Sequence, residues 1–460
     1  MFRSHSVLPA LWPAILITLF STGCASQRDA GWVDKRPLGA DVTSYRPSHR
    51  SVAVDSGAMD TTTPPLVADS LTLEQALAMT LLRSPRLRAF GWEVRAREAA
   101  ALQAAIPPNP ELASDLDNFG GTGRASGSSI AEATIGLSQL VHFGGDRRTG
   151  YRVAALERNL AGWDFEAARL DVLTSTTQAF ITVLAGQERL SLADSLLSQA
   201  TNFYNSVAAR VEAGKVSALE ERRASIVLAS SEIAREQVAR ILAVDRARLA
   251  AIWGSPAPLL NRAVGDLTLV PPIPSFEIVQ SFLERNPDVE RWKDEMAVRR
   301  ADVLHARAQG IPDPIFTLGA RRMHELNETS IVASVSIPLP LFDRNQGRIK
   351  ETRYRLRQGE EQRRAVTVMA NEMLVDAFQR LASASSEITA LRESILPSAR
   401  ENFSATQEGY RDGKFDLLTV LDAQRTFFEA ANQQIDVLET YHNARAEVER
   451  LIGTPLIDIL

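Results

Sequence analysis

The residues that could ligate a metal or move a proton are scattered along this sequence. The histidines are isolated, and no H-E-x-x-H or comparable spacing joins them to one another or to acidic residues. Gly120 to Gly123 is not a phosphate loop, because no strand-to-helix context surrounds it and no Gly-Lys-Ser/Thr follows. His324 and Glu325 share a short polar connection and could touch a cation, but a solvated loop tip is the better interpretation. The sequence therefore predicts no catalytic residue, no metal site and no cofactor. The histidines are His5, His49, His142, His305, His324 and His442.

The single cysteine, Cys24, follows an export signal. A weakly basic start precedes the short apolar core from Val7 to Phe20, and small residues come directly before the cysteine. The pattern over residues 1–23 is similar to a bacterial lipoprotein signal peptide, which implies lipidation of Cys24. The alternative is an ordinary signal cleaved nearby with Cys24 incidental, because Ser21 replaces the usual leucine.

Composition bounds the class of protein. The net charge of −5 gives no indication of a nucleic-acid surface. After the N-terminus no run of ~18 apolar residues appears, so the mature chain is expected to lack a transmembrane helix. A β-barrel stays open as a membrane solution, since its strands need only ~9–11 alternating residues. Residues 24–70 are rich in Ser, Thr, Pro, Gly and Asp and are expected to be an N-terminal tether.

Two pairs of segments alternate apolar and polar residues, which predicts strands. Strands near 313–323 and 329–341 flank a short polar connection and read as a β-hairpin, and strands near 111–119 and 129–142 form another. We expect the apolar face to meet lipid and the serines to line water, so a charge should impair membrane assembly more at Val335 than at Ser334. The apolar face of the last strand is Ile331, Ala333, Val335, Ile337 and Leu339.

The hairpins interrupt unusually long helices. If helical throughout, Arg147 to Glu212 would be ~99 Å long and Asn345 to Asp412 ~102 Å, and both are followed by Gly-Lys. Paired landmarks recur at one constant separation, which indicates an internal duplication with repeats at 71–260 and 261–460. The pairs are Phe143 and Phe342, Gly214 and Gly413, Gly254 and Gly453, and Pro256 and Pro455.

Prolines flank the hairpins where helix gives way to strand. Since proline lacks an N–H and cannot continue a helix, we expect these residues to act as a helix–strand swivel. Four strands cannot close a barrel alone, and open strand edges are not tolerated in lipid. If these strands sit in a membrane, several copies must therefore share one barrel in a symmetric ring. The swivel prolines are Pro107, Pro108, Pro110, Pro312, Pro314, Pro338 and Pro340.

This duplicated plan resembles the TolC-like outer-membrane factors of tripartite efflux pumps over residues 70–460. Pro312-Asp313-Pro314 and the segment from Ser336 to Gly347 resemble the branch from cobalt–zinc–cadmium resistance systems, with Pro107 to Pro110 and Phe143-Gly144-Gly145 as their partners in the first half. The resemblance implies a mainly α fold with a small β part. In it, three chains form a twelve-stranded outer-membrane β-barrel that continues into a long periplasmic α-helical coiled-coil barrel.

The resemblance also implies a periplasmic gate and an adaptor contact at the two Gly-Lys turns. Tyr410 and Asp422 match the tyrosine and one acidic residue of the family gate, while Thr419 stands where a further aspartate is expected. For Asp422 a solvated helix position is an equally good interpretation. The segments that match are Arg210, Gly214, Lys215, Val216 and Ser217 in the first half, and Tyr410, Gly413, Lys414, Phe415 and Leu418 in the second.

The function implied is a passive export duct with no enzymatic activity and no cofactor. It would be a homotrimer in the outer membrane of a Gram-negative bacterium, lipid-anchored, with a large periplasmic part. A periplasmic adaptor would join it to an inner-membrane RND-type pump, and heavy-metal cations are the expected cargo. The alternatives are the same duct for drugs, other small molecules or type I secretion, and a non-conducting coiled-coil envelope scaffold.

Overall fold

The computed structural model describes residues 68–123, 126–256 and 260–459, and within them one series of elements occurs twice. In the first series, Thr72 and Gln75 form a capping box at the start of α2, and Ser84 caps α3 directly before Pro85. The series is α2 (Leu73–Arg83), α3 (Pro85–Ala105), β2 (Glu111–Asp117), β3 (Glu132–Leu140), α4 (Asp146–Glu212) and α5 (Ala218–Ile252).

The second series follows the same order. Asn286 caps α7 directly before Pro287, as Ser84 caps α3 before Pro85. The series is α6 (Phe276–Ser281) with the 3₁₀ turn η2 (Leu283–Arg285), α7 (Pro287–Ala308), β5 (Ile315–Met323), β6 (Glu328–Ser336), α8 (Gln346–Ala390), α9 (Leu396–Arg411) and α10 (Leu417–Ile452), followed by the 3₁₀ turn η4 (Leu456–Ile459).

The second long helix is not uniform, which corrects the expectation of one α-helix from Asn345 to Asp412. The π-helical turn η3 (Leu391–Ile395) separates α8 from α9. Pro397 follows this turn and has no N–H to donate to a carbonyl one turn back. The wider π turn accommodates the missing hydrogen bond. The interior of α4 contains no proline, and α4 runs without interruption over 67 residues.

A small parallel sheet was not predicted from the sequence. β1 (Ala68–Thr72) pairs with β4 (Leu260–Val264), and Gln187 of α4 bonds the Ala263 backbone through both its amide groups. The expected tether therefore ends before residue 70, and the expected repeat boundary at 260 and 261 falls inside β4. Short strands without a clear alternating pattern leave little signal in a sequence.

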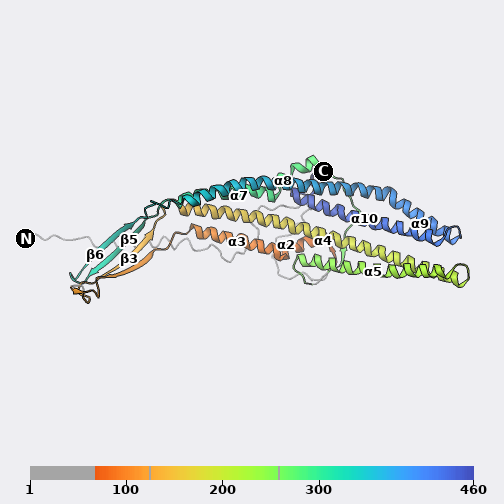
Figure 1. Cartoon of the computed structure of the whole chain (residues 1–460), viewed down its shortest axis with the longest axis horizontal. Coiled ribbons are helices and arrows are strands. Elements are labelled where there is room, and N and C mark those ends of the chain that lie inside the picture. The colour runs from red at the N-terminus through yellow and green to blue at the C-terminus, as the bar shows by residue number, and fades with distance from the viewer. Residues whose placement is uncertain (1–67, 124–125, 257–259, 460) are drawn as a thin grey trace, which may run out of the picture. The chain divides into compact units, whose positions relative to one another are not determined.

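The larger sheet has the strand order β2-β3-β5-β6, with antiparallel neighbours throughout (Figure 1). Its strands overlap the expected segments and are shorter than expected, and β6 begins one residue early, at Glu328. β6 ends at Ser336 instead of 341, because Pro338 and Pro340 cannot donate to a ladder. β5 begins directly after Pro314, and β2 ends before Asn118, whose positive φ of 56° breaks the strand.

Each series has its own apolar core, and a third core joins them. Phe180 and Leu242 centre the core of the first series, and Leu381 and Tyr441 that of the second. At the turns that follow α4 and α9, Val207, Tyr410 and Val420 belong to one cluster drawn from both series. None of the helices in the described ranges is long and apolar enough to cross a membrane. The expected fold class, mainly α with a small β part, is confirmed.

Candidate functional site

One face of the larger sheet is apolar and open to its surroundings. The register places Phe316 beside Val335, and Leu318 beside Ala333. Side chains that alternate along each strand therefore gather on a single face. Ile331 is 75% exposed and Leu112 76%, which is unfavourable in water unless an apolar medium or partner covers them. The exposed members of this face are Leu112, Leu116, Ile135, Phe316, Leu318, Ile331 and Val335.

The opposite face of the same sheet is polar. The hydroxyls of Ser138 and Thr317 lie 2.9 Å apart across neighbouring strands. Arg321 donates to Glu132 at 3.1 Å and to the Thr134 hydroxyl at 3.0 Å. One face of the sheet thus suits an apolar medium and the other suits water, as in the strands of an outer-membrane barrel.

The sheet has two open edges within the described part of the chain. β2 pairs only with β3, and β6 pairs only with β5. An open edge leaves a row of backbone N–H and C=O groups that must find partners. Since the two edges belong to opposite ends of one antiparallel sheet, a ring of copies could pair each β6 with the β2 of a neighbour.

All the predicted swivel prolines lie in connections between helix and strand. Pro107, Pro108 and Pro110 separate α3 from β2, Pro312 and Pro314 separate α7 from β5, and Pro338 and Pro340 separate β6 from α8. The connection from β3 to α4 has no proline and uses Gly144 and Gly145 instead.

The connection from β3 to α4 is fastened to the one from α7 to β5. His142 Nδ1 lies 2.6 Å from Asp313 Oδ2, and the Phe143 backbone N–H donates to Asp313 Oδ1 at 2.9 Å. Gly144 fits closely here, because a Cβ at this position would stand 2.5 Å from the Ala308 carbonyl oxygen. The middle strands therefore join their helices through a tight, specific contact.

At the other end of the long helices, Tyr410 links the two series. It is 6% exposed, its hydroxyl donates to Glu220 Oε2 at 3.1 Å, and its ring packs against Phe203. The Arg210 guanidinium lies 4.7 Å from the Tyr410 ring centroid and donates to its backbone carbonyl. Burial, together with the Glu220 carboxylate, raises the pKa of the Tyr410 hydroxyl, so it stays a neutral donor.

The remaining predicted residues of the turns are mostly exposed. Gly214 and Gly413 have φ of 67° and 75°, the left-handed conformation that ends each helix. Lys414 pairs with Asp412, and the Phe415 ring lies directly over Gly409. Ser217 caps α5. Within the part of the chain that the structure describes, the side chains of Lys215, Val216 and Leu418 form no hydrogen bond or ion pair.

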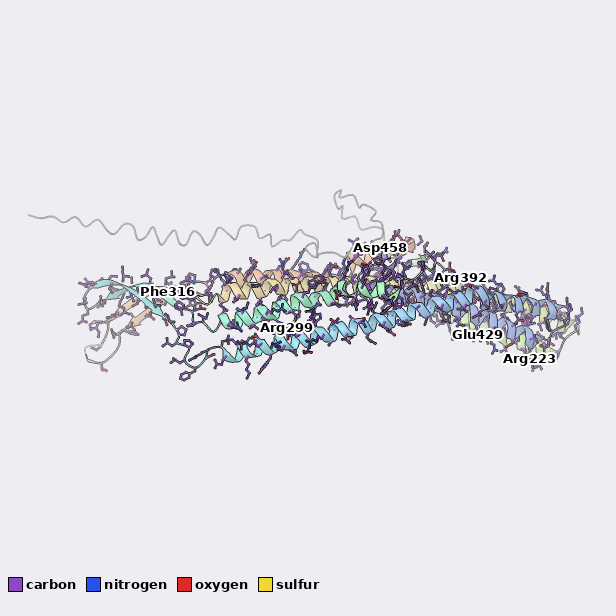
Figure 2. All side chains as sticks on the ribbon, turned by 90° about the horizontal axis from the view of Figure 1, so that it is seen from above. Arg223, Arg299, Phe316, Arg392, Glu429 and Asp458 are labelled. Atoms are coloured by element: carbon purple, nitrogen blue, oxygen red, sulfur yellow. The ribbon has the colours of Figure 1, made fainter. Side chains whose placement is uncertain are left out.

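The two expected acidic gate positions differ in role. Thr419 donates from its hydroxyl and its backbone N–H to Asp416, so Asp416 caps α10 and Thr419 completes that cap. Asp422 is exposed and pairs with Arg425 one turn further on. In Figure 2 the labels Arg223 and Glu429 mark this end of the molecule. The structure thus brings Tyr410 and Arg210 together and leaves Asp422 on the surface.

Several residues of these sites were missed from the sequence. Glu220 carries no motif, and its pairing with Tyr410 depends on two helices from different series. The contact of His142 with Asp313 likewise had no sequence signal, because it joins two connections from different series. Cys24 lies outside the described residues. His324 and Glu325 form part of the connection between β5 and β6, and no group of three or more metal-ligating side chains occurs in the described ranges.

The family model described as outer membrane efflux protein matches residues 76–255 and 278–454, one match for each series. The chain belongs to this family. The resemblance expected from the sequence is therefore confirmed. The family's members are channels and not enzymes.

Three relatives show the range of the similarity. The cobalt-zinc-cadmium resistance protein CzcC of Cupriavidus metallidurans is 31% identical over 418 residues, covering 91% of this chain and 98% of CzcC. The pyoverdine export outer membrane protein OpmQ of Pseudomonas aeruginosa is 26% identical, covering 79% and 81%. The nickel and cobalt resistance protein CnrC of Cupriavidus metallidurans is 27% identical, covering 68% and 73%.

The fold is also that of solved channels. A structure of CusC, a protein studied for transmembrane channel formation, superposes with a TM-score of 0.70 at 18% identity, covering 83% of this chain and 92% of the CusC chain.

Proposed function

We propose that this chain is one of three identical subunits of an outer-membrane duct, and that the duct exports heavy-metal cations for a tripartite efflux pump. The observation that carries the proposal is the larger sheet, with one exposed apolar face, one polar face and two open edges. Three such sheets paired edge to edge would close a barrel with lipid outside and water inside.

The cargo is proposed from the relatives. CzcC and CnrC are named for resistance to cobalt, zinc, cadmium and nickel, and CzcC aligns over nearly its whole length. OpmQ, named for pyoverdine export, supports the second candidate, an organic cargo carried by the same duct. In both cases the pump would choose the cargo, and the duct would let it pass.

The turns after α4 and α9 are the proposed periplasmic gate and adaptor contact. Tyr410, held by Glu220 and Arg210, would fasten the two series together in the closed state. Opening would require this contact to break while the outer membrane end stays fixed. The exposed Lys215, Lys414, Phe415 and Leu418 would face a periplasmic adaptor, which would in turn bind an inner-membrane RND-type pump.

The remaining proposals concern attachment and organisation. Cys24 would carry a lipid that anchors the N-terminus to the outer membrane, with residues 1–23 removed as signal. The two repeats would meet near residue 260. The prolines at the sheet would let the helices turn into the membrane strands at a fixed angle.

Two measurements test the proposal. Purified protein in planar bilayers should give stepwise conductance, and its absence would support the non-conducting scaffold. Deletion of the gene should lower resistance to cobalt, zinc or cadmium, with resistance restored by the wild-type gene. Unchanged metal resistance together with conductance would favour the organic cargo.

A further inference from the structure

The helices next to the larger sheet begin with a dense set of cations. α4 carries Arg147, Arg148 and Arg152 in its first turns. Arg344 precedes α8, which carries Lys350 and Arg353 near its start. All six side chains are exposed, and together they are called the cationic collar here.

The cationic collar has no carboxylate partners among the residues that the structure describes. The acids near it contact other groups, and Asp343 beside Arg344 accepts from the Asn345 backbone N–H. Asp146 faces His305, Asp313 holds His142, and Glu351 accepts from both Arg348 and Arg355. The cations form two groups, one at the start of α4 and one at the start of α8, and α7 contacts both helices. Within each group the unpaired cations repel one another, so each group favours an anion from outside the chain.

On α4 the cations form one coherent surface. Arg147, Arg148, Tyr151 and Arg152 stand at positions i, i+1, i+4 and i+5, which share one side of a helix. α4 contacts α3 and α7 within the chain, and the side that carries these cations is exposed. This side is therefore available to a ligand.

The depth of the cationic collar matches a headgroup layer. Arg152 stands six residues into α4, or ~9 Å from its start at ~1.5 Å per residue. A bilayer adds ~5–8 Å of polar headgroup region on each side of its hydrocarbon core. With the apolar face of the sheet in the hydrocarbon, Arg147 and Arg148 would lie at the level of the headgroups, and Arg152 would lie just beyond them, within reach of its long side chain.

Aromatic residues place the start of α4 on the lipid side. The Phe143 and Phe316 rings lie 6.4 Å apart, and Phe316 belongs to the exposed apolar face of the sheet. α4 begins three residues after Phe143, so its first turn starts close to that face. Tyr151 and Tyr354 are exposed beside the cations, and tyrosine favours a membrane interface because its ring is apolar and its hydroxyl polar.

We propose that the cationic collar binds the phosphate groups of anionic phospholipids in the periplasmic leaflet. Guanidinium groups suit this ligand, because their planar N–H pairs match phosphate oxygens. The inference goes beyond the export of cargo and rests on the proposed position of the sheet in the outer membrane.

The test is native mass spectrometry of the purified full chain in detergent with equal amounts of phosphatidylglycerol and phosphatidylcholine of identical acyl chains. The wild type should retain phosphatidylglycerol preferentially. The triple variant Arg147→Gln/Arg148→Gln/Arg152→Gln should lose at least ~10-fold of that preference, since each cation near an anionic surface contributes several-fold and the three factors multiply. Substituting the same three residues by lysine should preserve most of it.

The matched control is Arg222→Gln/Arg363→Gln/Arg411→Gln, three exposed arginines that lie far from the sheet along their helices. It should keep the preference for phosphatidylglycerol. Equal retention of the two lipids by the wild type, or equal losses in both triple variants, would overturn the proposal. Conductance of the same preparation separates the two ideas: a conducting protein without lipid preference refutes the cationic collar alone, and a silent protein with the preference refutes the duct alone.

Discussion

Tyr410 is the residue that most directly connects the two series at the turn end. Its hydroxyl, its ring and its backbone carbonyl each have a different partner, from α4 or α5. A hydrogen bond to a charged acceptor contributes ~1.5–3 kcal/mol, which is enough to bias a gate by an order of magnitude or more.

Replacing Tyr410 by Phe should therefore open the duct. The variant keeps the ring packing and loses only the hydrogen bond to Glu220, so the fold should persist while the conductance in planar bilayers rises several-fold. Tyr204→Phe is the matched control, because Tyr204 packs in the same cluster and its hydroxyl has no hydrogen bond that the described residues show. Equal conductance in the two variants would refute the idea that the hydrogen bond from Tyr410 to Glu220 keeps the duct closed.

His442 predicts a response to acid. Burial lowers the pKa of its imidazole below the ordinary value of ~6.5, while Nε2–H donates to the Leu267 carbonyl at 2.9 Å. The folded state therefore takes up a proton less readily than the unfolded one. The stability is fully present above pH ~6.5 and falls as the pH drops toward the lowered pKa.

The check is thermal unfolding at pH 7.5 and 5.5. His442→Gln cannot gain the proton, so its melting temperature should fall less between these two values than that of the wild type. An equal fall in both proteins would show that other groups dominate the acid response.

At the scale of the elements, the two faces of β6 make opposite predictions. Ala333→Arg puts a charge on the apolar face near the middle of the strand, at a cost of ~2–4 kcal/mol at the membrane midplane. Ser334→Arg puts the same charge on the polar face and should cost much less. The amount of assembled protein recovered from outer membranes measures the difference, and equal recovery would contradict the proposed orientation.

The close contact between the connections at the sheet predicts a strong effect of one methyl group. Gly144→Ala would force apart the Ala308 carbonyl and the Ile311 side chain, lowering the melting temperature of the assembled protein by an amount equivalent to ~1–3 kcal/mol. Gly347→Ala is its control, since a Cβ there meets nothing within 4 Å and a helical Gly→Ala change is favourable by ~1 kcal/mol. A loss confined to Gly347→Ala would reverse the interpretation.

The sequence predicted those elements whose periodicity is strong. The alternation from Ile331 to Val335 correctly predicted which side chains of β6 share a face, because a shift of register by one residue would move every side chain to the opposite face. Pro397 is a sequence signal for the π turn that precedes it, because a proline inside a helix leaves one carbonyl without an N–H partner. The pairing of β1 with β4 and of Tyr410 with Glu220 had no sequence signal, since both unite segments far apart in the chain and depend on how long helices pack.

For the whole molecule, the open edges β2 and β6 predict the assembly. Protein extracted in mild detergent should have three times the mass of one chain by native mass spectrometry, because three sheets close the proposed barrel. A monomer or dimer that still conducts would contradict this.

The same spectrum tests lipidation. A mass increase that matches acyl chains attached to a mature N-terminus at Cys24 would establish it.

The proposed shared barrel also has a genetic consequence. When a copy with a defective sheet that still enters the ring is expressed in equal amounts with the wild type, random mixing leaves only about one assembly in eight with three sound sheets. Each defective chain therefore disables sound neighbours, so such an allele should be dominant over the wild type. A loss-of-function change confined to the cargo-handling pump would be recessive if that pump acts as single chains, so the open edges of one sheet set the pattern of inheritance.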